Sequence, residues 1–306
     1  MQRELTNSRA VIRVYDEPDT SLHYEAQRKL FNAIFDVASN PDSNTQAIIA
    51  THSVVMVDKA PAKSIVQVIQ NNGCSSIDYL KAESDEDISD FLSQISTVGG
   101  IKNSSIFFEK CFLIVEGESE KAAIPIIYEK IFNRKLPEFG IVLINLHSNG
   151  AWSNFLTLLK HNKKHSTVML LDSDTQNPEC GANVTVEKLQ GIGFEEEFLH
   201  NNVFFAGLQE FEDIFPDNKI REVFNKLYPK PENDEWTIEQ IEQLRVTYPK
   251  ITKGFKEESW SFFPHHKKRY RKPEFMIEMV KELNKEELEQ FEVLIRLFEK
   301  VHEIVS

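Results

Sequence analysis

The 306 residues of this chain allow two domains of ordinary size. With 41% hydrophobic and 27% charged residues, the composition indicates a soluble globular protein and excludes disordered and fibrous classes. The apolar runs are too short to span a bilayer, and no signal-like stretch follows Met1. Three widely spaced cysteines provide neither a disulfide framework nor a zinc site. We therefore expect a cytoplasmic location. The net charge, 35 − 48 = −13, excludes a uniformly basic nucleic-acid binder but not a nuclease, because metal-dependent nucleases need carboxylates.

The first seventy residues are predicted to form strand, helix, strand, helix and strand in that order. Apolar spacing predicts a helix over Leu22–Val37. Strands are predicted over Val11–Tyr15, Gln46–Ala50 and Ser64–Ile69. The polar, acidic stretch Asn71–Asp90 indicates a linker, joined to a helix over Asp87–Val98.

A second cycle of strands and helices begins at Cys111. Strands are predicted over Cys111–Val115, Ile141–Leu146, Thr167–Leu171 and Val203–Ala206, with helices over Glu118–Phe132 and Gly150–Lys160. This alternation predicts parallel β-α-β units, which keep their chemistry at the carboxyl ends of the strands. After Gln209 the pattern is helical, over Lys219–Leu227, Thr237–Val246, Pro273–Leu283 and Lys285–Val305.

Carboxylates and a histidine follow the first two strands. Asp16-Glu17-Pro18-Asp19 ends the first, and Thr51-His52-Ser53 ends the second. This order resembles the second half of an ABC-type ATPase head, in which Asp16 would end the Walker B strand and bind the metal, Glu17 would be the hydrolytic carboxylate and His52 the switch histidine. None of the eleven glycines fits G-x-x-x-x-G-K-[ST], so we expect ATP binding only if another segment or chain supplies the Walker A half. A strand-end turn with a buried histidine is the alternative.

Four acidic residues follow two strands of the second cycle. Glu116 and Glu120 flank Gly117, which we expect to permit a sharp turn into a helix that places both glutamates on one side. Asp172 and Asp174 share a face if their segment is extended. Adjacent parallel strands would bring all four together, where they repel one another unless divalent cations neutralise them. A solvated acidic loop is the alternative.

These motifs resemble the Toprim domain, and the V-E-G-x-S-E form is similar to that of the overcoming-lysogenization-defect (OLD) nuclease family, which joins an ABC-type ATPase to a C-terminal Toprim domain. The resemblance implies that the protein cleaves DNA with two Mg²⁺ or Mn²⁺ ions. The implied metal ligands are Glu116, Glu120, Asp172 and Asp174. It also implies a role in defence against phage or plasmids. Glu118 is expected to point away from the ions.

The helical tail carries further candidates. Comparable tails of the family have an acidic segment beside the metals, so Glu212 and Asp213 are candidates for the second ion, although an ordinary acidic helix start is the alternative. Lys272 resembles the family's tail lysine, which would stabilise developing phosphorane charge, and Lys267, Lys268, Arg269 and Arg271 are the alternatives for this role. Cations interleaved with aromatics between Lys253 and Lys272 are typical of a nucleic-acid groove or of a basic surface that balances an acidic protein. The predicted DNA-binding residues are Lys267, Lys268, Arg269 and Arg271.

We therefore expect an α/β protein with a partial ABC-type ATPase segment (1–75), a linker (76–108), a Toprim domain with a Rossmann-like parallel sheet (109–208) and a helical extension (209–306). The expected partners are DNA, and either a second copy or a chain carrying the N-terminal ATPase half. Two alternatives stay open. One is a fragment of a Toprim primase or topoisomerase, and the other is a non-catalytic regulator that binds another ATPase chain.

Overall fold

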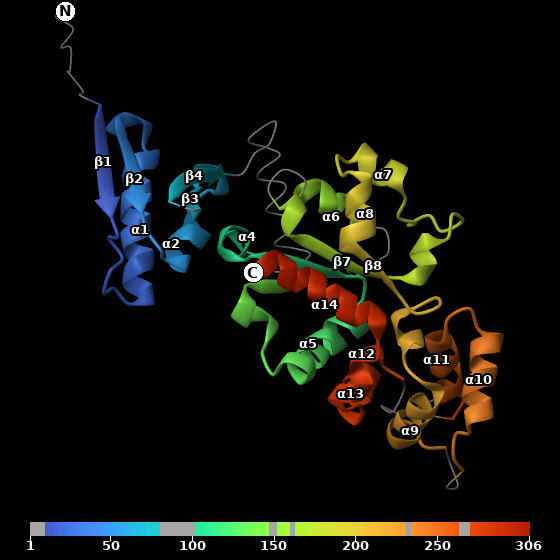
Figure 1. Ribbon diagram of the computed structural model, residues 1–306. Helices are drawn as coiled ribbons and strands as arrows, with labels where there is room; N and C mark the ends of the chain where they lie inside the picture. The colour runs from blue at the N-terminus through green and yellow to red at the C-terminus, as the bar shows by residue number, and fades with distance from the viewer. Residues whose placement is uncertain are drawn as a thin grey trace, which may run out of the picture. The chain divides into compact units, whose positions relative to one another are not determined.

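The computed structural model describes residues 10–71, 73–79, 102–146, 152–159, 163–230, 234–262 and 270–306. The chain divides into two compact units, an N-terminal unit of Met1–Gln94 with Ile101–Phe107 and a C-terminal unit of Ile95–Gly100 with Phe108–Ser306 (Figure 1). Among the described residues, no helix is both long enough and apolar enough to cross a membrane.

The N-terminal unit contains two small sheets. β1 (Val11–Asp16) pairs in parallel with β2 (Thr45–Ala50) through the crossover helix α1 (Tyr24–Ser39), as predicted. β3 (Val66–Asn71) pairs with the antiparallel strand β4 (Cys74–Tyr79). The prediction of a linker from Asn71 was wrong at β4, because Gly73 adopts a φ of +80° and reverses the chain into a hairpin. The short helices α2 (Val54–Lys59) and α4 (Asn103–Phe108) complete this unit, and the helix predicted over Asp87–Val98 lies outside the described residues.

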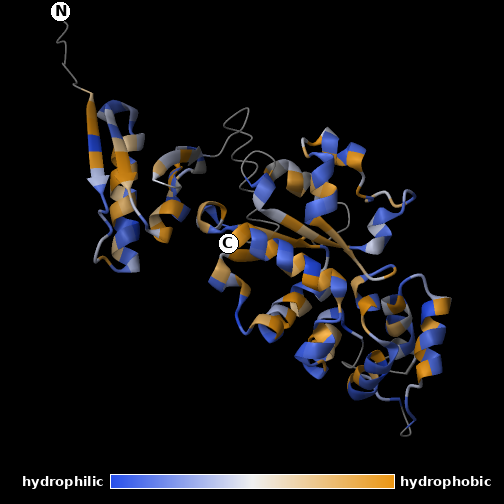
Figure 2. Cartoon of the chain, viewed as in Figure 1, coloured by the Kyte–Doolittle hydropathy of each residue, from blue (hydrophilic) through white to orange (hydrophobic). Residues whose placement is uncertain are grey.

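The C-terminal unit contains the predicted parallel sheet. Its strands are β5 (Cys111–Val115), β6 (Ile141–Asn145), β7 (Thr167–Asp172) and β8 (Val203–Ala206), in the order β6-β5-β7-β8. Every residue of β5 and β7 is buried, as expected of central strands covered on both faces. Figure 2 shows these strands as mostly hydrophobic and the surrounding helices as amphipathic, with hydrophobic and hydrophilic residues on different sides. The α/β class with a parallel sheet is therefore confirmed.

Helices lie on both faces of this sheet (Figure 1). α5 (Glu118–Phe132) follows β5 with the predicted bounds, and α6 (Trp152–Leu159) precedes β7. Two further helices, α7 (Val186–Gly191) and α8 (Glu196–Asn202), were not predicted, because six or seven residues are too few for a helical period to show.

The C-terminal helices are α9 (Asp217–Leu227), α10 (Ile238–Thr247), α11 (Ile251–Phe262), α12 (Lys272–Glu282), α13 (Lys285–Leu288) and α14 (Glu292–Val305). α11 was not predicted, because its many cations and aromatic residues were interpreted by composition alone. The prediction of one helix over Lys285–Val305 was wrong: Phe291 leaves the helical conformation with a ψ of 83° and packs its ring against Phe215 at 5.3 Å.

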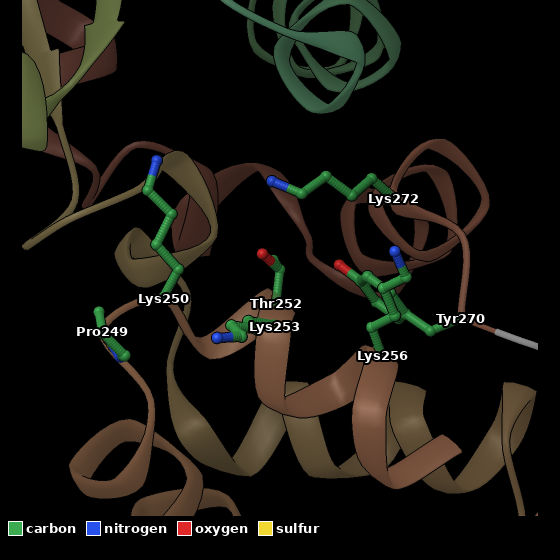
Figure 3. A pocket seen from close by; sticks show the side chains of 7 residues that line it. All are labelled: Pro249, Lys250, Thr252, Lys253, Lys256, Tyr270 and Lys272. Atoms are coloured by element: carbon green, nitrogen blue, oxygen red, sulfur yellow. The ribbon is translucent and has the colours of Figure 1, made fainter. Parts of the chain in front are cut away.

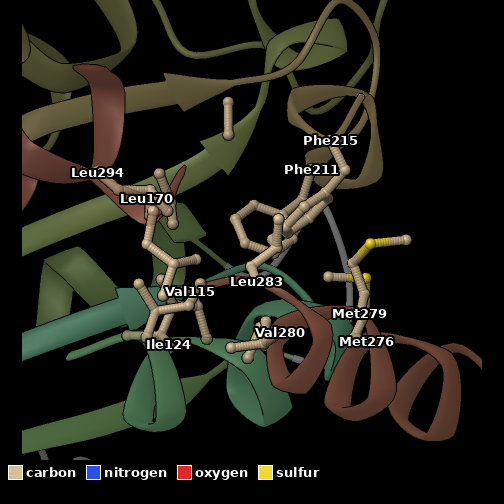
Figure 4. Packing of buried hydrophobic residues seen from close by; sticks show 14 of the residues in the cluster. Val115, Ile124, Leu170, Phe211, Phe215, Met276, Met279, Val280, Leu283 and Leu294 are labelled. Carbon is tan, nitrogen blue, oxygen red and sulfur yellow. The ribbon is translucent and has the colours of Figure 1, made fainter. Parts of the chain in front are cut away.

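The sheet and the C-terminal helices share one hydrophobic core. Val115 and Leu170 of the sheet, Phe211 after β8, and Met279 and Val280 of α12 belong to the same buried cluster (Figure 4). Lys130 of α5 also joins the two helices by hydrogen bonds. Its ammonium donates to the carbonyl oxygens of Val280, Lys281 and Leu283 at 2.7–2.9 Å and so caps the C-terminal end of α12. The helices are thereby fixed against the carboxyl edge of the sheet, where the acidic residues lie.

Candidate functional site

Three of the predicted carboxylates converge at the ends of β5 and β7. Glu116, Asp172 and Asp174 each offer an oxygen, and these oxygens lie within 4.8 Å of one another. Glu116 is held by the backbone N–H of Asp172, which donates to its Oε2 at 2.9 Å. Asp172 accepts from the backbone N–H of Phe211 at 2.9 Å. Asp174 is brought in by a 3-10 turn over Ser173–Gln176, so the convergence does not arise from an extended segment as we expected.

Lys250 lies between two members of this triad. Its ammonium is 2.7 Å from Asp174 Oδ2 and 3.1 Å from Asp172 Oδ2. Burial lowers the pKa of Lys250, but the carboxylates of Asp174 and Asp172 raise that pKa more, so it stays charged. The other oxygen of Asp174, Oδ1, is buried and has no hydrogen-bond partner among the described residues. The triad therefore already attracts one cation and leaves an acceptor unused.

A second group of carboxylates adjoins the triad. Glu120 and Glu212 are 3% and 1% exposed, and Ser119 Oγ donates to Glu212 Oε1 at 2.5 Å. Lys272 places its ammonium 3.5 Å from Glu212 Oε1 and 3.1 Å from Glu210 Oε2. Glu210 is fully buried and also accepts from the backbone N–H and hydroxyl of Thr252 at 2.7 and 2.6 Å. Glu210 therefore fixes Lys272 and the start of α11 to the acidic group.

Burial and mutual repulsion make these acids unusually hard to ionise. Burial, with a contribution from Asp172, raises the pKa of Glu116 to about 7. Burial and then the charges of Asp172 and Glu212 raise the pKa of Glu120 well above its ordinary value. The pKa of Glu212 is also about 7, because its burial outweighs the favourable charge of Lys272. A divalent cation would relieve this cost by neutralising the ionised forms.

Two glycines shape the loops that carry the acids. Gly117 has a φ of −138°, which any residue can adopt, so it is not needed for a sharp turn; instead, a Cβ there would lie 3.2 Å from Glu120 Oε2. Gly207, which the sequence analysis overlooked, has a φ of +74°, and a Cβ would lie 1.8 Å from the carbonyl oxygen of Glu210. Gly207 is therefore required for the turn that carries Glu210 and Glu212 to the site.

Two other acids have contacts of their own. Asp213 accepts from the backbone N–H groups of Gln209 and Glu210 through Oδ2 and from Arg245 through Oδ1, at 2.6–3.0 Å. These contacts assign Asp213 to the turn after β8 rather than to the carboxylate group. Glu118 is exposed and accepts from the amide of Asn145 at 2.6 Å, outside the triad.

The predicted DNA-binding residues are only partly described. Lys267, Lys268 and Arg269 lie outside the described residues, whereas Arg271 is exposed immediately before α12. A separate cavity of about 520 Å³ lies beside Lys250 and Lys272 (Figure 3).

The ATPase-like residues come together in the N-terminal unit. The Glu17 carboxylate lies 3.2 Å from His52 Nε2, and the backbone N–H of Glu17 donates to the carbonyl of Ala50 at 2.8 Å. Glu17 has a φ of +43°, an uncommon conformation for a glutamate. Asp16 is exposed at the end of β1. The His52 side chain is 92% exposed, so it is not the buried histidine of the alternative reading.

Similarities to known proteins agree with both sets of residues. The family described as overcoming lysogenization defect protein-like, TOPRIM domain, matches residues 107–174, and the AAA ATPase domain family matches residues 1–57. The Old nuclease of Escherichia phage P2 is 26% identical over 138 residues, a match that covers 44% of this chain and 23% of the relative, so less than a quarter of that protein's length is represented.

Two solved structures are also similar. The C-terminal region of the Burkholderia pseudomallei OLD protein is 15% identical with a TM-score of 0.44, covering 65% of this chain and 100% of that one. The C-terminal region of the Xanthomonas campestris pv. campestris OLD protein is 14% identical with a TM-score of 0.39, covering 66% and 96%. The ATPase match precedes the Toprim match, as in the resemblance drawn from the motifs, and the two matches together with the similarity to the Old nuclease support an OLD-type protein.

Proposed function

We propose that this chain carries the nuclease site of an OLD-type enzyme and hydrolyses phosphodiester bonds in DNA with divalent cations, Mg²⁺ or Mn²⁺. The observation that supports this proposal best is the triad of Glu116, Asp172 and Asp174, whose oxygens lie within 4.8 Å of one another. The similarity to a protein named as a nuclease is consistent with it.

The residues of the triad fit a divalent cation. Hard cations prefer carboxylate oxygens, and three are available here. The unpartnered Asp174 Oδ1 provides an acceptor that no described protein group uses. Lys250 already places a positive charge between Asp172 and Asp174, which is consistent with a site that favours cations.

Glu120 and Glu212 are the ligands that we propose for a second cation. Both are buried, and Glu212 is close enough for its charge to raise the pKa of Glu120. The charge of Asp172 also raises the pKa of Glu120, so the two carboxylate groups adjoin there. When bound, two cations would supply an activated water and neutralise charge on the leaving oxygen.

The lysines have a role of their own in this proposal. Lys272 is held by Glu210 and Glu212, which keep its ammonium charged and restrict its position. An ammonium fixed in this way can donate to a phosphate oxygen and stabilise the charge that develops in the transition state. The ammonium of Lys250 is ion-paired to Asp172 and Asp174, on the triad side of the site. From there it can donate to the same phosphate.

We further propose that Glu17 and His52 act in ATP hydrolysis when a Walker A half is supplied by a second copy or another chain. Their contact of 3.2 Å supports a shared role. Within the described residues, the apolar side chains of Ile12 and Val14 of β1 are 63% and 70% exposed, which suits a face of the small sheet that another segment or chain covers. ATP turnover by this chain alone would contradict the proposal.

Defence against phage or plasmids is the biological role that we propose for the assembled enzyme.

Plasmid nicking with Mn²⁺ tests the nuclease proposal. Asp172→Asn and Glu120→Gln should each lower the cleavage rate at least about a hundredfold. Each substitution removes a negative charge that would hold a catalytic cation, and the bound cations stabilise the transition state by several kcal/mol. Glu129→Gln, on the exposed face of α5, is the matched control and should cut at the wild-type rate. Equal cutting by wild type and Asp172→Asn would remove the proposal.

A further inference from the structure

One ammonium group already pairs with two of the three carboxylates proposed for the first metal ion. Lys250 Nζ lies 2.7 Å from Asp174 Oδ2 and 3.1 Å from Asp172 Oδ2, and both aspartates belong to the triad of converging oxygens. A divalent cation held by the triad needs these same two carboxylates. Because two cations drawn to one pair of carboxylates repel each other, the metal ion and the lysine compete for Asp172 and Asp174.

The ammonium satisfies the triad only in part. Within the described residues, no salt bridge joins Lys250 to Glu116, the third member. Asp174 Oδ1 is buried and has no hydrogen-bond partner there either, so one oxygen of the pair is left without a donor. A lysine offers three N–H groups and a single charge, whereas a divalent cation takes about six oxygen ligands and carries twice that charge. The metal ion is therefore the stronger competitor for these oxygens.

The backbone of Lys250 is held in place, whereas its side chain has room to move. Lys250 directly precedes α11, and its carbonyl oxygen accepts from the backbone N–H of Lys253 at 3.1 Å. Two residues further on, Thr252 donates through its backbone N–H and its hydroxyl to the buried Glu210 at 2.7 and 2.6 Å. The Lys250 side chain is 31% exposed and lines the cavity of about 520 Å³ beside the carboxylates (Figure 3). Rotation of its side-chain bonds can therefore withdraw the ammonium without moving the backbone.

We propose that Lys250 is the counter-ion of the first metal position, that a divalent cation displaces its ammonium from Asp172 and Asp174, and that this exchange sets the metal concentration at which the site fills. The inference rests on the proposed nuclease function and deepens it. Before metal binds, Lys250 holds the two aspartates together. After the exchange, the ammonium stays beside the triad, because its backbone does not move, and becomes available to a phosphate oxygen.

Mn²⁺ binding to the full chain, measured by isothermal titration calorimetry, tests the competition. Lys250→Met removes the ammonium but keeps a long side chain, and it should bind the first Mn²⁺ at least about tenfold more tightly than wild type. Lys253→Met is the matched control, because it removes the same charge from an exposed side chain three residues further on. At about 0.15 M salt its Mn²⁺ affinity should stay within about threefold of wild type.

Two results of the titration would overturn the proposal. One is an equal Mn²⁺ affinity of wild type and Lys250→Met. The other is an equal gain in Mn²⁺ affinity in Lys250→Met and Lys253→Met, because the effect would then come from net charge and not from the contact with the aspartates.

A second measurement uses the wild-type chain, so it does not depend on how a variant folds. Acetylation by an N-hydroxysuccinimide ester, followed by mass spectrometry, reports how readily each lysine amine reacts. In EDTA, Lys250 should react slowly, because two carboxylates engage its amine. Saturating Mn²⁺ should speed its acetylation at least about fivefold and leave Lys253 unchanged. A Lys250 that is protected equally with and without Mn²⁺ would rule out the displacement, whatever the affinities are.

Failure of this inference can be told apart from failure of the nuclease proposal. Plasmid nicking that requires Asp172, together with a Lys250 that Mn²⁺ does not release, would remove the exchange alone. Release of Lys250 by Mn²⁺ without any nicking would keep the exchange and remove the nuclease. If neither wild type nor Lys250→Met bound Mn²⁺, the metal site itself would be absent and both proposals would fall.

Discussion

Without metal, the buried Glu116 should make the C-terminal unit less stable as the pH rises. Its pKa is about 7 in the folded chain, against an ordinary value of 4.5. Because the folded-state pKa is the higher one, the stability is fully present below about pH 4.5 and is lost as the pH rises through about 7. The difference between the two pKa values corresponds to a loss of about 3 kcal/mol in the free energy of unfolding above about pH 7.

Glu116→Gln removes this loss while keeping an oxygen that can accept from the backbone N–H of Asp172. In EDTA, the variant should be more stable than wild type by about 3 kcal/mol at about pH 8, and the two should converge at about pH 4. Chemical denaturation of the C-terminal unit at a series of pH values measures this. Glu286→Gln, an exposed glutamate of α13, is the control and should follow wild type.

Metal should remove this difference in stability between the two proteins. Mn²⁺ at about a hundred times its dissociation constant should add about 3 kcal/mol to wild type and much less to Glu116→Gln, which has lost a ligand. The reasoning is refuted if wild type in EDTA keeps the same stability between about pH 5 and pH 8, or if Glu116→Gln is no more stable than wild type at the upper end.

Three further substitutions test the supports of the site by thermal or chemical unfolding. Gly207→Ala should cost at least about 2 kcal/mol, since it adds a Cβ 1.8 Å from the Glu210 carbonyl at a positive φ, and an unchanged melting temperature would contradict this. Lys130→Met should cost about 2–4 kcal/mol by leaving three carbonyls of α12 without their donor, whereas Lys135→Met, a nearby exposed lysine, should cost little. Lys272→Met should destabilise the metal-free chain by about 3 kcal/mol, because Glu210 and Glu212 lose their counter-charge, and a variant as stable as wild type would contradict this.

The parallel sheet and the acidic triad could be predicted because local signals define them. Short apolar runs mark the strands, and Gly117 directly after β5 marks the start of α5. Parallel strands align their carboxyl ends, so Glu116 and Asp172 could be placed together from strand order alone. Their oxygens do converge, although the 3-10 turn that carries Asp174 was not foreseen.

The rest of the site depends on long-range packing that leaves no local mark. Lys250 meets Asp172 across 78 residues of sequence, and nothing around Pro249 distinguishes it from other surface lysines. Glu210 looks like one more acid in an acidic segment, and only the folded chain shows that Thr252 and Lys272 surround it. The role of Gly207 needs the position of the Glu210 carbonyl, which no sequence pattern provides.

The acids of the site and the lysines that face them come from five separate stretches of the polypeptide, beginning with Glu116 and ending with Lys272. α12 packs against α5 in the shared core and is capped by Lys130. During synthesis, the early carboxylates leave the ribosome long before their counter-charges do. A growing chain therefore holds the acids without the groups that position them, and a hydrolytic centre of the proposed kind stays harmless until the last helices have been translated and packed.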